Sequence, residues 1–196
     1  MARHAGRGFS TIEYPTGMNQ NGDPTQAWIK LKPDGRVDVF AGTVDIGQGS
    51  KTVHTQIVAD TLGVPYDWVT MDNSNTDSSA VCTGTFASRG TFIGGNAVRF
   101  AAERVRERIL DIASKELEIS ADDLEIVDGE VQAKGAPDRK ISIPDVAGLE
   151  LGSEYRQMTP ERRSGDLLPE HLVAQQAPDG EHLATYRGAA SNGGGR

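Results

Sequence analysis

The sequence predicts an α+β fold with hairpins and a mixed sheet, and with two main helices packed on one face. Apolar residues alternate over short stretches within residues 27–41 and 124–133, as they do in strands with one buried face. They recur at helical spacing after Ser50 and after Gly95. The order strand, strand, helix, strand, helix, strand, strand is typical of an α+β layer.

The two ends of the chain lack these patterns. Residues 1–26 are polar and rich in Gly, Asn and Thr, with a short strand expected at Phe9–Tyr14. Residues 151–196 are polar and broken by prolines, and they offer no apolar face to bury. We expect an irregular N-terminal arm over 1–26, a folded domain over 27–150 and an extended polar C-terminal tail over 151–196.

The first predicted element of the domain is a hairpin. The stretches 27–32 and 36–41 flank a Pro-Asp-Gly turn at residues 33–35. Proline presets φ, and glycine accepts a positive φ, so this tripeptide favours a tight reversal.

A helix is predicted to follow, with Ser50 as its N-cap and Gly63 and Pro65 as its stop. Its apolar residues recur at helical spacing: Val53, Ile57, Val58 and Leu62. Residues 67–71 then alternate like a strand, and residues 72–91 form a long loop rich in Ser, Thr, Asn and Gly. Loops of this length inside compact domains are usually functional or disordered.

A second helix is expected from the Gly-Gly-Asn sequence at 94–96 to about Leu117. A second hairpin follows, with strands at 124–127 and 130–133 around an Asp-Gly turn. Residues 140–143 then read as a strand that leads into a helix start at Pro144-Asp145.

Charge and cysteine content exclude several functions. The formal net charge of −8 argues against nucleic-acid binding, which requires a basic stripe. Cys82 is the only cysteine, so this chain alone holds no disulfide, zinc thiolate site or iron–sulfur cluster. We expect Cys82 to be a small inert side chain and His54, which has no second histidine at ligand spacing, to lie at the surface or pack.

No apolar run approaches the ~18 to 20 residues of a membrane span, and residues 1–8 lack the apolar stretch of a secretory signal. The sequence therefore predicts a cytoplasmic protein without a membrane span.

Two turns rich in small residues each feed a helix start, at residues 42–50 (GTVDIGQGS) and 83–91 (TGTFASRGT). The uncovered amides and the positive dipole end of a helix favour anions there. Two such ends predict one large anionic cofactor.

These residues resemble the molybdenum-cofactor-binding subunit of the xanthine dehydrogenase and aldehyde oxidase family. The resemblance rests on the order of the Gly-Gln-Gly turn at 47–49, the helix opening at 50–55 and the segment 86–98, and it covers roughly residues 5–150. It implies that 27–150 is part of a molybdopterin-binding α+β domain. The implied cofactor is a molybdopterin dinucleotide.

The resemblance assigns a catalytic role to Gln48, whose amide N–H₂ would donate to an oxygen ligand of the molybdenum. A neutral amide suits this role because it stabilises charge on oxygen without titrating. Read from the residues alone, Gln48 can also be an ordinary polar turn residue. The resemblance assigns cofactor binding to Gly47, Gln48, Gly49, Phe86, Ala87, Ser88, Arg89, Thr91 and Asn96, and no metal ligand. Arg89 can pair with a phosphate or be a solvated surface charge, and Asn96 can contact the pterin or cap its helix.

The implied chemistry is hydroxylation of an N-heterocycle or aldehyde with oxygen derived from water. The family's general-base glutamate lies beyond the part resembled, so the chain is expected to be a split or truncated subunit, inactive alone. The implied partners are the remaining portion of the molybdopterin subunit, an iron–sulfur subunit and a flavoprotein subunit with FAD, besides a small-molecule substrate. The alternative is a non-catalytic remnant, or a module that binds a phosphate-bearing ligand or a partner protein. A generic nucleotide-binding domain is disfavoured because neither glycine-rich nucleotide fingerprint is present.

Overall fold

A mixed three-stranded sheet forms the base of the domain in the computed structural model, which describes residues 4, 6–14, 16–17 and 24–149. Its strands are β1 (Ala27–Leu31), β2 (Val37–Ala41) and β3 (Val69–Asp72), in that order. β1 and β2 are antiparallel, as the predicted hairpin requires, and β2 and β3 are parallel. In β1 and β2 every second residue is buried, which confirms the predicted alternation.

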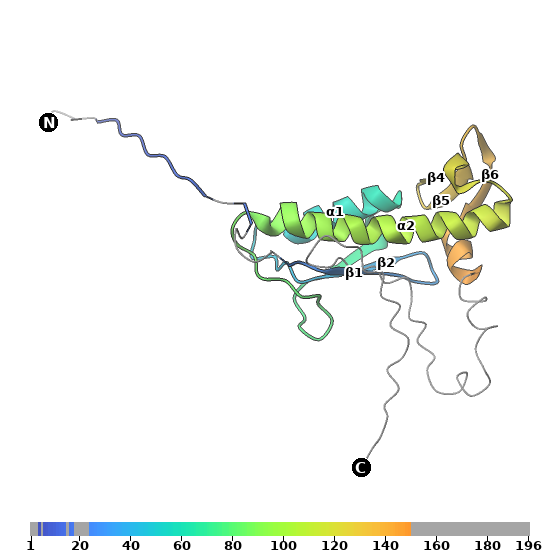
Figure 1. Ribbon diagram of the computed structural model, residues 1–196, viewed down its shortest axis with the longest axis horizontal. Helices are drawn as coiled ribbons and strands as arrows, with labels where there is room; N and C mark the ends of the chain where they lie inside the picture. The colour runs from blue at the N-terminus through green and yellow to red at the C-terminus, as the bar shows by residue number, and fades with distance from the viewer. Residues whose placement is uncertain (1–3, 5, 15, 18–23, 150–196) are drawn as a thin grey trace, which may run out of the picture.

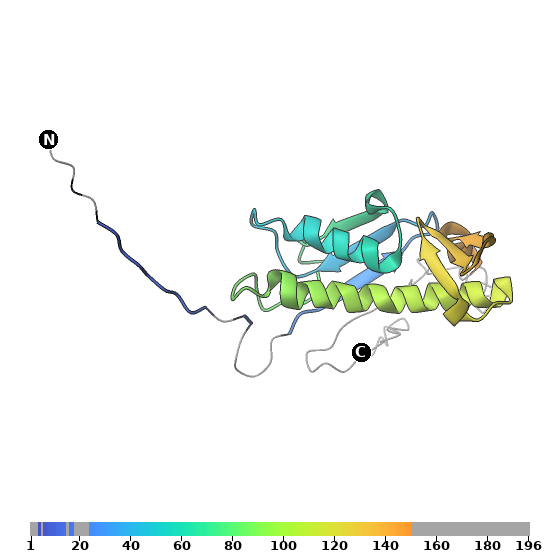
Figure 2. The same ribbon diagram turned by 90° about the horizontal axis from the view of Figure 1, so that it is seen from above.

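Two helices cover one face of this sheet. Helix α1 (Ser50–Leu62) makes the crossover between the parallel strands β2 and β3, and the longer α2 (Gly95–Leu117) lies beside it (Figures 1 and 2). Both helices begin at the same end of the molecule, so the two turns that precede them are neighbours (Figures 1 and 2). The predicted α+β class, with two helices on one face, is confirmed.

A second, antiparallel sheet lies near the far end of α2 (Figure 1). It contains β4 (Leu124–Val127), β5 (Glu130–Ala133) and β6 (Ala136–Ser142), after a 3₁₀ turn η3 (Ala121–Asp123). Residues 143–149 are helical, in line with the helix start predicted there. One cluster of buried apolar side chains joins the helices and both sheets into a common core.

Several local predictions are wrong. Residues 9–14 have no regular structure, so the strand expected at Phe9–Tyr14 is absent. β6 begins at Ala136 rather than at 140. A 3₁₀ turn, η1 (Tyr66–Trp68), precedes β3 and shortens the strand expected from residue 67.

The start of α2 also differs from the prediction. Five residues before the α-helix form a π-helical turn, η2 (Gly90–Gly94), so the helical path begins inside the loop expected to end at 91. π-turns are rare, and they occur frequently at functional sites. The end of α2 at Leu117 is as predicted.

In the part of the chain that the structure describes, no helix is both long enough and apolar enough to cross a membrane. The predicted tail over 151–196 lies outside the described residues, as does part of the arm over 1–26.

Candidate functional site

The first turn, residues 42–49, is organised by the carboxylate of Asp45. Its Oδ1 accepts the amides of Gly47 at 2.9 Å and Gly49 at 3.3 Å, and its Oδ2 accepts the amide of Lys51 at 2.9 Å. The hydrogen bond from Lys51, followed by that from Gly47, lowers the pKa of Asp45 below its usual value. Asp45 thus occupies amides that the sequence predicted to be open to an anion.

This arrangement corrects the predicted N-cap of α1. The N-cap residue is Gly49, with φ of 81°, and Ser50 is the first helical residue. Asp45 precedes the helix, and its carboxylate accepts the amide of Lys51 in the first helical turn, as a capping side chain does.

Gln48 is exposed at the tip of this turn, and its amide binds the turn itself. Oε1 accepts the amide of Ile46 at 2.7 Å, while Nε2 donates to the Val44 carbonyl at 3.0 Å and to Ser50 Oγ at 3.1 Å. For Nε2 to donate to a cofactor oxygen, one of its two present hydrogen bonds must be exchanged.

The glycines on either side of Gln48 leave the turn open. Gly47 has φ of 107° and Gly49 φ of 81°, a region that other residues rarely adopt. No heavy atom outside the adjoining residues lies within 4 Å of a Cβ built on either one. A ligand can therefore approach the backbone closely on both sides of Gln48.

The second turn contains two successive left-handed residues that are not glycine. Ala87 has φ of 49° and Ser88 φ of 51°, and Arg89 then returns to the right-handed region at φ of −90°. A left-handed residue followed by a right-handed one, as at Ser88 and Arg89, is the backbone geometry of a nest that can bind an anion. Two amides of this turn already have partners: the Arg89 amide donates to the Phe86 carbonyl at 3.1 Å and the Ala87 amide to the Tyr14 hydroxyl at 3.0 Å. Because left-handed conformations of residues other than glycine cost of order 1–3 kcal/mol each, the surroundings must hold them in place.

The surroundings that hold this turn come from the N-terminal part of the chain. The amide of Ala87 donates to the Tyr14 hydroxyl at 3.0 Å, and the amide of Gly17 donates to the Ala87 carbonyl at 2.7 Å. The amide of Thr83 donates to the Pro24 carbonyl at 3.4 Å.

Arg89 is buried, with 1% of its surface exposed. Its guanidinium donates to the Gly84 carbonyl at 2.6 Å, to Cys82 Sγ at 2.9 Å and to the Pro24 carbonyl at 3.2 Å, and it also contacts the Thr25 hydroxyl. The alternative that Arg89 is a solvated surface charge is therefore wrong. Its guanidinium is turned into the protein rather than toward the surface of the turn.

The two turns meet at the Val44 carbonyl. This oxygen accepts Gln48 Nε2 at 3.0 Å and Thr85 Oγ1 at 3.1 Å. A second connection runs from α1, where His54 Nε2 lies 3.0 Å from the Gly90 carbonyl. The structure thus brings Gln48 and the turn that contains Ser88 together at one end of the molecule.

His54 packs in the interior rather than at the surface, with 0% exposed. Because a carbonyl only accepts hydrogen bonds, Nε2 carries the proton toward Gly90, and the buried Nδ1 has no partner among the described residues. Burial lowers the pKa of His54, against the opposing influence of the Gly90 carbonyl and Asp45.

The remaining predicted site residues lie around the second turn. Phe86, 43% exposed, and Thr91 are at the surface. Asn96 is inside the first turn of α2, and its Nδ2 donates to the Phe92 carbonyl at 2.7 Å. The N-cap of α2 is Gly94, so the capping role considered for Asn96 is wrong, and the side chain closes the π-turn instead.

Sequence reasoning missed Asp45, Thr85 and Tyr14. Asp45 stands two residues before Gly47, which is the spacing of an Asx-turn and could have been recognised. Thr85 and Tyr14 act through contacts 41 and 73 residues apart, for which the sequence carries no local signal.

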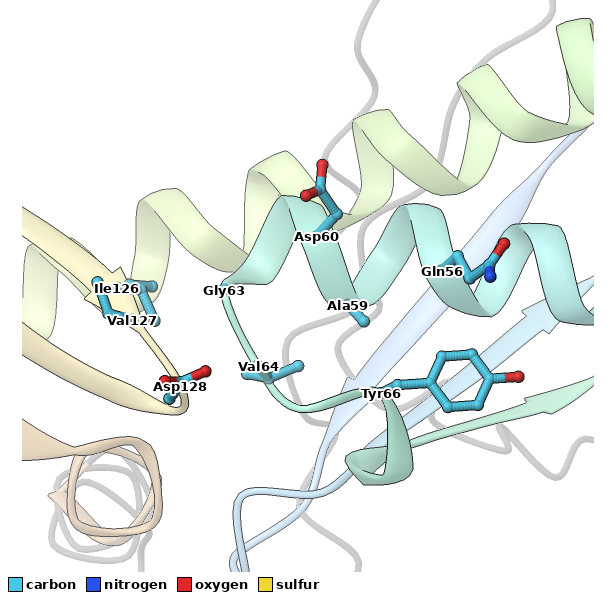
Figure 3. A pocket seen from close by; sticks show the side chains of 9 residues that line it. All are labelled: Gln56, Ala59, Asp60, Gly63, Val64, Tyr66, Ile126, Val127 and Asp128. Carbon is cyan, nitrogen blue, oxygen red and sulfur yellow. The ribbon is translucent and has the colours of Figure 1, made fainter.

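A hollow of about 580 Å³ lies elsewhere, between the C-terminal end of α1 and the β4–β5 hairpin (Figure 3). Its lining includes Asp60, Tyr66 and Asp128, and none of the predicted site residues. Among the described residues, no group of three or more His, Cys, Asp or Glu side chains is arranged to hold a metal ion.

Comparison with known proteins identifies the family of the chain. The molybdopterin cofactor-binding domain family matches residues 2–177. The large subunit of nicotine 6-hydroxylase from Paenarthrobacter nicotinovorans is 34% identical over 137 residues, which are 67% of this chain and 17% of that protein. The carbon monoxide dehydrogenase large chain of Afipia carboxidovorans is 32% identical over 134 residues, which are 68% of this chain and 17% of that protein.

Quinoline 2-oxidoreductase from Pseudomonas putida 86 has a similar fold, with a TM-score of 0.64 and 31% identity over 78% of this chain and 18% of the other. The family match and the shared fold define a molybdopterin cofactor-binding module. The chain belongs to the molybdopterin cofactor-binding domain family, as the sequence predicted. It spans less than a fifth of the relatives named here: 17% of the two large subunits and 18% of the quinoline enzyme.

Proposed function

We propose that the chain supplies part of the molybdopterin dinucleotide site of a molybdenum hydroxylase. The observation that carries this proposal is the meeting of the two turns at the Val44 carbonyl, which accepts hydrogen bonds from Gln48 and Thr85. A cofactor with a metal head and a pyrophosphate needs two adjacent groups of donors. The two turns offer them from one surface.

The residues fit such a cofactor by shape and by donor type. Gly47 and Gly49 leave open space beside the backbone, and the change from left-handed Ser88 to right-handed Arg89 is the backbone geometry of an anion-binding nest. We assign cofactor contact to the turn around Gln48 and to Phe86, Ala87, Ser88, Thr91 and Asn96, with Arg89 holding the second turn from within.

When bound, the cofactor supplies a two-electron oxidation that adds a water-derived oxygen to an electron-poor carbon. The part of this chain is to bind and orient. Gln48 offers an uncharged donor whose strength does not change with pH, and the exposed Ser88 hydroxyl offers a second donor.

The substrate class we propose is an N-heterocycle or an aldehyde. Two relatives, nicotine 6-hydroxylase and quinoline 2-oxidoreductase, bear the names of N-heterocycles, which supports the first of these. Because the chain has one cysteine, iron–sulfur clusters would reside on a partner subunit. We assign FAD to a further partner subunit. We further propose that the chain is cytoplasmic and inactive without those subunits and the rest of the large subunit, where the general base would lie.

The test uses the enzyme assembled with all its subunits. Gln48→Ala and Gln48→Glu should each lower turnover by about 10²-fold, because both remove the donor, while molybdenum and pterin content stays unchanged. Gln56→Ala is the matched control, since Gln56 is an exposed glutamine on α1 that lines the distant hollow.

Unchanged turnover in both Gln48 variants would return this side chain to the status of a turn residue. An assembled complex without molybdenum and pterin would overturn the proposed function itself.

A further inference from the structure

The guanidinium of Arg89 joins segments of the chain that are far apart in sequence. Pro24 and Thr25 precede β1, whereas Cys82 and Gly84 belong to the long loop before α2. We propose that Arg89 is a positioning residue that clasps these segments and thereby fixes the left-handed Ala87–Ser88 turn in its cofactor-binding shape. The cofactor-binding role of this turn rests on the function proposed above, whereas the contacts of Arg89 do not.

The contacts of Arg89 use the planar fork of its side chain. Nη1 donates to the Gly84 carbonyl at 2.6 Å and to Cys82 Sγ at 2.9 Å, whereas Nη2 donates to the Pro24 carbonyl at 3.2 Å and contacts the Thr25 hydroxyl. One rigid group thus sets the distance between the two segments. Lysine, with a single nitrogen on a flexible stem, cannot reproduce this geometry.

The same two segments are joined by backbone pairing beside the clasp. Thr25 and Cys82 form an antiparallel bridge, and the amide of Gln26 donates to the Val81 carbonyl at 2.9 Å. The residues before β1 therefore lie alongside the loop before α2. The Arg89 side chain donates hydrogen bonds to both segments. Because Arg89 directly follows Ser88, the clasp anchors the C-terminal side of the turn, as Tyr14 and Gly17 anchor Ala87.

Cys82 reports on the clasp because its sulfur is one of the acceptors. Burial raises the pKa of this thiol, but a backbone hydrogen bond at Gly84 and the side chains of Thr25, Arg89 and Thr43 outweigh it and lower the pKa below its usual value. Since the chain has one cysteine, any thiolate detected in a titration belongs to this residue.

The experiment compares the full chain with Arg89→Lys and Arg89→Met. In both variants we expect the amides of residues 84–90 to exchange at least about tenfold faster with solvent, while the amides in the middle of α2 keep their rates. The thiol of Cys82 should titrate at a higher pH in Arg89→Met than in the unchanged chain. Arg104→Met is the control, because Arg104 lies on α2 and pairs at the surface with Glu107 at 3.1 Å.

Thr25→Val provides a milder variant in case removal of the arginine prevents folding. It removes one acceptor and leaves the guanidinium with its other contacts, so the exchange of residues 84–90 should rise without loss of the fold. Exchange rates equal to those of the unchanged chain in both Arg89→Lys and Thr25→Val would overturn the clasp.

Failure of the proposed function would look different. The clasp could pass these tests on the chain alone while the assembled enzyme lacked molybdenum and pterin, and only the role of the turn in cofactor binding would then fall. Loss of molybdenum and pterin from the assembled enzyme that carries Arg89→Lys, reversed when Arg89 is restored, would support both the clasp and its role in cofactor binding.

Discussion

The two turns of the site are built in opposite ways. The first turn is held by Asp45 and Gln48, whose partners stand between two and six residues away. The second turn is held by Tyr14, Pro24 and Thr25: Tyr14 binds Ala87 across 73 residues, and Pro24 and Thr25 bind Arg89 across 65 and 64 residues.

This difference separates a turn that can form by itself from one that depends on the rest of the fold. Local contacts close small loops at little entropic cost, whereas contacts over long separations form only when the segments between them are ordered. We therefore expect substitutions near the second turn to affect stability more than substitutions in the first.

The largest effect is expected for Gly42→Ala, because Gly42, at the start of the first turn, packs against the loop that carries the second turn. A Cβ at this position would lie 2.2 Å from the Ala80 carbonyl oxygen and 2.6 Å from Cys82 Cβ, so the loop that carries the second turn would have to shift. We expect a loss of about 1–3 kcal/mol in the free energy of unfolding, measured by denaturant titration. Gly6→Ala is the control, because nothing lies within 4 Å of its Cβ position. Equal stability of Gly42→Ala and the unchanged chain would contradict the close packing of this loop.

The free energy of unfolding should depend on pH through His54, which connects α1 to the Gly90 carbonyl. Its folded-state pKa is lowered by burial, so the unfolded chain binds more protons as the pH falls below the usual value of 6.5. Stability should be full above that value and decline below it. His54→Gln keeps a donor for the Gly90 carbonyl but does not titrate, and it should flatten the decline in denaturant titrations between pH 7.5 and 5.

The control for His54 is His4→Gln, because His4 is exposed in the N-terminal arm. A decline that persists unchanged in His54→Gln would assign it to other groups.

A smaller effect, of opposite sign, is expected for Ser88→Gly. Ser88 is exposed and left-handed, and glycine adopts that region without the steric cost of a Cβ, so the variant should gain up to about 1 kcal/mol in thermal unfolding. Ser74→Gly, an exposed serine in the same loop without a positive φ, should instead lose stability. A loss in both variants would mean that Ser88 is not strained.

The smallest effect is expected in the self-contained first turn, for Asp45→Asn. Because the folded-state pKa of Asp45 is lowered, its carboxylate stabilises the fold above the usual value of 3.8, and this contribution disappears as the pH falls through the lower folded value. Asp45→Asn should remove that part of the loss of stability at low pH. It should also lower the melting temperature slightly at neutral pH. Asp60→Asn, near the other end of α1, is the control with the same change in charge, and an equal effect there would contradict a specific role for Asp45.

The sequence predicted well those features that depend on local pattern. The first hairpin, the Gly63 end of α1 and the Asp-Gly hairpin between β4 and β5 follow from alternation and turn chemistry alone. The motif order also predicted one site for Gln48 and Ser88, and the structure brings their two turns together at the Val44 carbonyl. What could not be predicted was the direction of side chains. Arg89 turns inward, and two of its acceptors, Pro24 and Thr25, lie outside any local window of the sequence.

The π-helical turn η2 makes the site sensitive to chain length. Five residues here occupy a single wide turn, and each residue of an ordinary helix advances the chain by about 100° around the axis. If the same five residues were α-helical, the chain on their N-terminal side, including Ser88, would be rotated around the axis of α2 by about 100°. Deletion of Ile93 would instead leave four residues, the number that an α-helical turn needs to keep Ser88 in place. The geometry of the site therefore depends on the number of residues in this stretch.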